Sequence, residues 1–71
     1  MLDGPENLEV PDDLAEGLDA DPRARANFDA FPPSARKGYL GWIAMAKTDA
    51  TRRRRIQTTV ERAAADLRPG A

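Results

Sequence analysis

The chain has 71 residues, of which 41% are hydrophobic and 32% charged, with a formal net charge of −1. A chain of this length can bury only one small core. Because it contains no Cys and no His, disulfides and His/Cys zinc sites are excluded as stabilising elements, and helix packing or association must hold the fold together.

The charge is divided between the two parts of the chain. Residues 1–31 carry nine acids against two arginines, a balance of −7, whereas the remainder carries nine bases against three acids, a balance of +6. This asymmetry indicates either a basic binding half or two halves that neutralise each other on folding. The start has no apolar run, and no segment approaches the ~20 apolar residues that span a bilayer. We therefore expect a cytoplasmic protein without membrane insertion.

The first elements follow a polar N-terminal lead-in over residues 1–9. Pro11 suits a first helical position, acids follow it, and Leu14 and Leu18 form an apolar pair one turn apart, which predicts a helix over 11–19.

Asp21 and Pro22 repeat this start signal and predict a second helix over 22–30. Its apolar stripe comprises Ala24, Phe28 and Phe31. The following Pro32-Pro33 ends it and can open the next helix.

A third helix is predicted over 33–47. Tyr39, Trp42, Ile43 and Ala46 stand at i, i+3, i+4 and i+7, which predicts that Tyr39 and Trp42 are core residues and that Leu40 points away from the core. On this interpretation, replacing Trp42 with Ala costs about 3–5 kcal/mol.

Thr48 predicts the N-cap of a fourth helix over 49–67, ended by Pro69-Gly70. Its apolar positions recur at helical spacing: Ile56, Val60, Ala63, Ala64 and Leu67. No run alternates as a strand does. The sequence thus predicts an all-α fold, a small bundle of three to four short helices without a sheet, forming one domain over 10–68 with a tail over 69–71.

The ordered motifs of this helical pattern resemble the YdeI/OmpD-associated (OmdA-type) domain family of bacteria. They are Val10-Pro11 with Leu14 and Leu18, Asp21-Pro22 with Ala24 and Phe28, Pro33-Ser34 with Arg36, Tyr39, Trp42 and Ile43, then Ala46-Lys47, Thr51-Arg52, Arg55-Ile56 and Val60. The resemblance implies a compact α-helical domain, linked by name to bacteriocin protection or an outer-membrane porin, without an established biochemical activity.

The chain departs from the pattern expected of this family at Gly38, Gly41 and Ala63-Ala64. Each helical glycine costs about 1 kcal/mol relative to Ala, so the third helix should be less stable. The two alanines should reduce the apolar area that the fourth helix contributes to the core. The glycines have two interpretations: drift in a tolerant domain, or a groove beside Trp42. Gly38 lies beside the Trp42 stripe, where a missing side chain could let another helix approach, whereas Gly41 lies further round the helix and has no such role.

Arg52 to Arg55 form the sharpest candidate for a binding function. At 100° per residue, Arg52 and Arg53 flank the direction of Ile56, Arg55 lies to one side and Arg54 on the outer face, so the run cannot form one flat patch. Cations in the first turns of a helix oppose its macrodipole, so an acidic group should offset them. The acids of the first half, a partner protein and a phosphate backbone are the three alternatives.

The sequence therefore predicts a non-catalytic interaction domain that binds an acidic protein partner through a basic rim on the third and fourth helices. The predicted contact residues are Arg36, Lys37, Lys47, Arg52, Arg54 and Arg55. Nucleic-acid binding through the same residues is the alternative, although no known nucleic-acid motif is present. A purely structural accessory domain is a further alternative.

Enzymatic activity is not expected, because the chain lacks an imidazole base and a thiolate nucleophile. We also expect no cofactor, no metal and no small-molecule substrate. Acids in a first helical turn, here Asp12, Asp13 and Glu16, usually serve the helix dipole rather than a cation.

Overall fold

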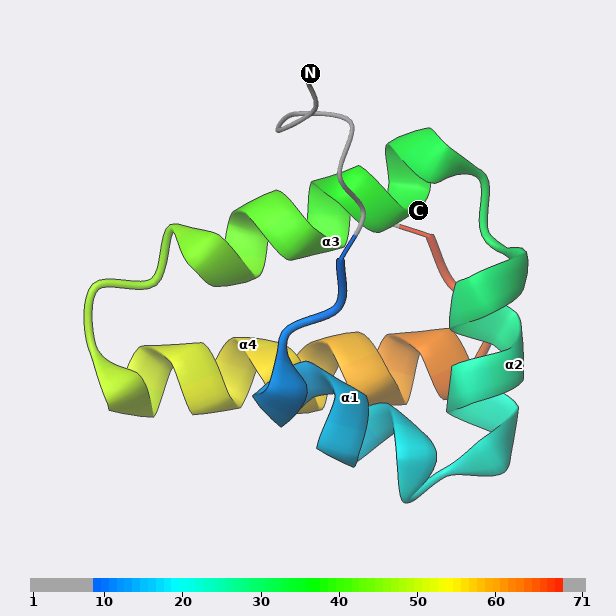
Figure 1. Cartoon of the computed structure of the whole chain (residues 1–71), viewed down its shortest axis with the longest axis horizontal. Helices are drawn as coiled ribbons and strands as arrows, with labels where there is room; N and C mark the ends of the chain where they lie inside the picture. Colours follow the sequence, from blue (N-terminus) through cyan, green and yellow to red (C-terminus); the bar gives the residue numbers. More distant parts are fainter. Residues whose placement is uncertain (1–8, 69–71) are drawn as a thin grey trace.

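Four helices follow one another in the computed structural model, which describes residues 9–68. They are α1 (Asp12–Asp19), α2 (Pro22–Ala30), α3 (Pro33–Ala44) and α4 (Asp49–Ala64). Helices α3 and α4 run in opposite directions, with α2 crossing at one end of the pair and α1 lying against α4 (Figure 1). The described residues contain no strand, and the predicted all-α bundle is confirmed. Almost all of the predicted lead-in, residues 1–8, and the predicted tail, residues 69–71, lie outside the described residues.

The helix starts use two devices that the sequence signalled. The Asp21 carboxylate accepts hydrogen bonds from the backbone N–H groups of Arg23 and Ala24, at 3.2 and 3.3 Å, and so caps α2. Thr48 caps α4 in the same way through the N–H of Thr51, at 3.2 Å. Pro11 is extended, with ψ of 153°, and immediately precedes α1. The predicted start at residue 11 was therefore one residue too early.

The C-terminal end of α3 differs from the prediction. The helix ends at Ala44, not at Lys47, because the chain must leave it to reverse direction before α4. The N–H of Met45 still donates to the Gly41 carbonyl at 3.0 Å. The N–H of Ala46 donates to the Ile43 carbonyl at 3.1 Å, which is the shorter spacing of a 3₁₀ turn. Ala46 therefore contributes to no helical stripe.

The end of α4 also comes earlier than predicted, at Ala64 rather than Leu67. Asp66 adopts a left-handed backbone conformation, with φ of 62°. Its N–H bonds the Ala63 carbonyl at 2.9 Å, and the N–H of Leu67 bonds the Arg62 carbonyl at 2.8 Å. This pair of bonds is the Schellman motif, which satisfies the last carbonyls and turns the chain out of the helix.

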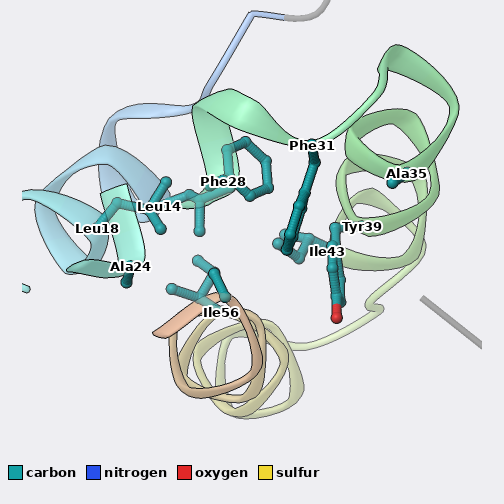
Figure 2. Packing of buried hydrophobic residues seen from close by; sticks show 10 residues of the cluster. Leu14, Leu18, Ala24, Phe28, Phe31, Ala35, Tyr39, Ile43 and Ile56 are labelled. Carbon is teal, nitrogen blue, oxygen red and sulfur yellow. The ribbon is translucent and has the colours of Figure 1, made fainter. Parts of the chain in front are cut away.

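The core is one apolar cluster contributed by all four helices, with the α2–α3 connection adding Phe31. Its members are Leu14, Leu18, Ala24, Phe28, Phe31, Ala35, Tyr39, Ile43, Ile56 and Ala63. In Figure 2 the leucines of α1 lie on one side, Phe31, Tyr39 and Ile43 lie on the other, and Phe28 and Ile56 lie between them. The ring centroid of Phe28 lies 6.1 Å from that of Phe31 and 6.4 Å from that of Tyr39. Phe28 thus joins the two sides.

Trp42 is not a core residue, and this prediction was wrong. It is 38% exposed, whereas Tyr39 is 3% exposed, as predicted. The buried ridge of α3 runs through Ala35, Tyr39 and Ile43, which are spaced by four residues, so the buried face is centred beyond Tyr39 on the side away from Trp42. Leu40 lies on that side and packs partly buried against the core, contrary to the prediction that it points outward.

Helices α1 and α4 approach each other closely at Gly17. A Cβ atom added to this glycine would lie 3.0 Å from Cγ2 of Val60 and 3.7 Å from Cγ2 of Ile56. Gly17 therefore allows the α1 backbone to lie directly on the side chains of α4.

Candidate functional site

Two of the three exposed large hydrophobic residues within residues 9–68 lie at the C-terminal end of α3, and the third is Leu67. Trp42 is 38% exposed and Met45 is 73% exposed, although both are large apolar side chains. The Arg55 guanidinium donates a hydrogen bond to the Trp42 carbonyl at 2.7 Å, and its central carbon lies 5.1 Å from the indole centroid. This cation–π contact fixes Trp42 at the edge of the core while leaving part of the ring in solvent.

A stripe of exposed residues continues from this end along α3. Gly38, Gly41, Trp42 and Met45 stand at i, i+3, i+4 and i+7, and all four are exposed. We call these four residues the α3 outer stripe. A Cβ atom added to Gly41 would meet nothing within 4 Å. Apart from its two chain neighbours, no described residue therefore lies close to the position that a Gly41 side chain would take.

The segment that carries the α3 outer stripe has charges of one sign only. From Ala30 to Thr48 the chain contains no acid and three bases, Arg36, Lys37 and Lys47. Both lysines are exposed, whereas Arg36 is half-buried. Arg55 adds a fourth positive charge at Trp42.

Arg52 has an intramolecular partner. Its Nε donates to Oδ2 of Asp13 at 2.7 Å, and a second guanidinium nitrogen donates to Oδ1 at 3.2 Å. These hydrogen bonds hold the pKa of the Asp13 carboxyl below its usual range and raise the pKa of Arg52. For Arg52, the acid that offsets its charge thus comes from the acidic half of the chain.

The six predicted contact residues do not form one patch. Arg36 and Lys37 lie in the first turns of α3, and the eight-residue rise from Arg36 to the helix end is about 12 Å. Lys47 and Arg55 lie at the opposite end, near Trp42. Arg54 is exposed, and 200° of rotation from the buried Ile56 places it on the outer face of α4.

Sequence reasoning missed the exposed Trp42 and the adjoining Met45 as candidate contact residues. The periodicity of α3 fits both a stripe centred on Trp42 and one centred beyond Tyr39. Only the positions of α2 and α4 distinguish them. The presence of Met45 directly after the last helical turn was the one available signal.

A shallow groove of about 430 Å³ lies between α1 and α4, and the sequence did not predict it. Its floor is apolar, with Gly17, Ile56 and Val60 at the closest approach of the helices. Its rim carries polar and charged residues of both signs: Asp13, Glu16, Arg53, Gln57 and Glu61. This mixed rim favours no ligand of a particular charge.

The described residues contain neither a metal-binding cluster nor a membrane-spanning helix. Within residues 9–68 no group of three carboxylates could hold a metal ion. In the same part of the chain, no helix has the length and apolar character needed to cross a membrane. The described structure thus defines a small all-α domain whose candidate site is an exposed surface.

The family of this domain follows from its sequence match. The chain belongs to the OmdA family, because the family model described as "Bacteriocin-protection, YdeI or OmpD-Associated" matches residues 7–66. This confirms the resemblance inferred from the ordered motifs. No curated protein and no solved structure matches the chain.

Proposed function

We propose that this OmdA domain is a non-catalytic interaction module that docks an acidic protein partner at the last turn of α3 and the residues around it. The observation that carries the proposal is the exposure of Trp42 beside Arg55. Tryptophan and arginine are the residue types most often responsible for binding energy at protein interfaces. Here the two are already held against each other, at 5.1 Å, so little side-chain entropy remains to be lost on binding.

Charge supports an acidic partner. Three acids of the first half pair with bases inside the domain: Arg25 pairs with Asp29 at 3.3 Å and with Asp19 at 3.7 Å, and Arg52 pairs with Asp13. The stretch from Ala30 to Thr48 has no acid within it. Lys37 on α3 and Lys47 after its end are both exposed, so they can attract and orient an acidic surface.

Nucleic-acid binding is the second candidate, and one observation favours it. The exposed indole of Trp42 beside Arg55 and Lys47 resembles the combination of ring and cation on which single-stranded bases stack. The arginine run of α4 gives it less support, because Arg52 is neutralised by Asp13 and Arg54 lies on another face. We therefore place the acidic protein first.

The test is a crosslinking pull-down from the native cell. Lys47→Glu/Arg55→Glu reverses charge at the proposed surface. The control is Arg23→Glu, because Arg23 is an exposed base on α2, and α2 lies at the end of the α3–α4 pair opposite the α3–α4 connection (Figure 1). We expect an acidic protein to be captured by the wild type and by Arg23→Glu, and to be lost with Lys47→Glu/Arg55→Glu. Equal capture by all three chains would overturn the surface, and no capture would favour the accessory-domain alternative.

A titration of labelled single-stranded DNA and RNA at low and moderate salt decides the second candidate. Binding at low salt that weakens steeply as salt rises would support phosphate contacts. Absence of binding at low salt would remove the nucleic-acid alternative.

A further inference from the structure

We infer that the docked part of the partner is an α-helix with an acidic and partly apolar face, which packs closely against α3 at Gly41. This inference rests on the proposed function and deepens it, since it names the form of the partner and the residue that admits it.

The exposed side chains of Trp42 and Met45 form an apolar contact that favours a partner with apolar side chains. Met45, the C-cap of α3, has a helical backbone conformation and follows Trp42 by three residues, so the exposed parts of the two side chains lie on one face. A partner that offers charge alone would leave this apolar pair in water. An amphipathic helix covers it with one or two apolar side chains, as helices do in the grooves of other receptors.

Gly41 gives the surface its shape. The distance between two packed helix axes depends on the side chains at the contact, and a glycine permits a close approach. Gly41 lies one turn before Met45 and precedes Trp42 in the chain, so a helix that approaches the backbone at Gly41 also comes near these two side chains. No described group of the chain occupies that space, and an added methyl would stabilise α3 by propensity alone. The glycine therefore has no packing role within the domain.

The positions of Lys37 and Lys47 indicate which charge the partner helix carries and how long it is. Lys37 precedes Gly41 by one turn, and Lys47 follows Met45 closely, so exposed positive charges lie on both sides of the apolar pair. Helix α3 has 12 residues, which is about 18 Å of helix. A partner helix of similar length with carboxylates near both ends would meet both lysines while its apolar side chains cover Trp42 and Met45.

The experiment maps binding of three synthetic peptides onto the ¹⁵N-labelled chain by amide chemical shifts. The first peptide is an amphipathic Glu/Leu helix, the second is a proline-interrupted Glu/Leu peptide of the same composition that cannot form a helix, and the third is an amphipathic Lys/Leu helix. The variant is Gly41→Ala, and the matched control is Ala26→Gly, which changes an exposed position of α2.

We expect the acidic helix to shift the amides of residues 37–47 and the other two peptides to bind more weakly. Gly41→Ala should raise the Tm by about 4–8 °C and still weaken binding of the acidic helix roughly tenfold, the scale of one misplaced methyl group in close packing. Ala26→Gly should lower the Tm and leave the binding unchanged. A gain in stability with a loss of binding cannot arise from misfolding.

Each other result has a defined meaning. Equal binding of the acidic helix by Gly41→Ala and wild type, or equal binding of both acidic peptides, would overturn the inference while the proposed function stands. Binding of no acidic peptide at residues 37–47 would overturn both. Concentration-dependent shifts of the same amides without peptide would make a second copy of the chain the occupant and would overturn the helical partner.

Discussion

The two sides of α4 are packed in different ways. On the α1 side, the backbone at Gly17 lies so close to α4 that an added Cβ would be 3.0 Å from Val60. On the α3 side, the helices are joined by long side chains: the Tyr39 hydroxyl donates to the Leu67 carbonyl at 2.8 Å and accepts from Arg62 at 3.0 Å. Gly41 on that side faces open space.

This difference shows that one residue type serves opposite purposes in one small domain. In α1 the missing side chain brings two helices together, and the resulting contact stabilises the fold. In α3 the missing side chain lowers helix stability without an internal contact in return. Gly17 thus lies at a helix contact, whereas Gly41 lies on the exposed face of a helix whose opposite face is part of the core.

The largest expected effect separates a buried residue of the α1 side from an exposed residue of the α3 side. Leu18 is 0% exposed, and Leu18→Ala should lower the free energy of unfolding by about 2–5 kcal/mol, enough to unfold much of a domain this small. Trp42→Ala should cost only about 1–2 kcal/mol, because part of the ring is already in water. Thermal unfolding followed by circular dichroism checks both. Equal losses for the two variants would contradict the assignment of Trp42 to the surface.

The glycine pair gives the sharpest form of the comparison. Gly41→Ala should raise the free energy of unfolding by about 1 kcal/mol, the propensity gain alone. Gly17→Ala should lower it by about 1 kcal/mol, because Val60 is stiff at χ1 within a helix and cannot move away from the new methyl. Urea unfolding of both variants measures this difference. If both substitutions were stabilising, the close approach of α1 to α4 would be wrong.

A smaller effect is expected from Tyr39→Phe, which removes only the hydroxyl that links α3 to the end of α4. The free energy of unfolding should fall by about 0.5–1.5 kcal/mol, the usual net contribution of a hydrogen bond. Amide hydrogen exchange should quicken at Leu67 and Arg68 more than in α1. Uniform quickening throughout the chain would indicate that the hydroxyl supports the whole core.

The smallest expected effect concerns the ion pair of the α1 side and depends on pH. Because the pKa of Asp13 is lowered in the folded chain from 3.8, its stabilising contribution is complete above that value and is lost as the pH falls through the folded-state pKa. Asp13→Asn should therefore lower the Tm at pH 7, and its difference from the wild type should shrink below about pH 4.

The control for this pair is Asp12→Asn, which removes a neighbouring exposed charge from the same helical turn. It should change the Tm less than Asp13→Asn at pH 7, since only Asp13 bonds Arg52. A Tm difference for Asp13→Asn that stays constant from pH 7 to pH 2 would exclude the ion pair as its cause.

Much of the helical layout could be predicted from the sequence, because the signals at helix starts are local. Asp21-Pro22 and Thr48 determine their caps within three residues, and α2 begins and ends where these signals predicted. The ends of α3 and α4 were predicted three residues too late, since a chain reversal and a left-handed Asp66 depend on what the next segment must reach.

The candidate site could be predicted only in part. Its basic character follows from the acid-free stretch after Asp29, which is a property of the sequence. The grouping of its residues does not follow from the sequence. Arg52, for example, is paired with Asp13, which lies 39 positions away in the chain. Whether Lys47 and Arg55 act together on a partner stays a prediction.

The sequence by itself determined the four helical segments and the division of charge, because capping, proline geometry and apolar spacing act over a few neighbouring residues. Only the tertiary structure decided which face of α3 is buried, which glycine is a contact and which arginine is neutralised. These depend on where α4 lies between α1 and α3 (Figure 2). A helical period of 3.6 residues leaves the centre of an apolar stripe uncertain by one position on either side. Contact with a neighbouring helix removes that uncertainty, and it leaves Trp42 at the surface.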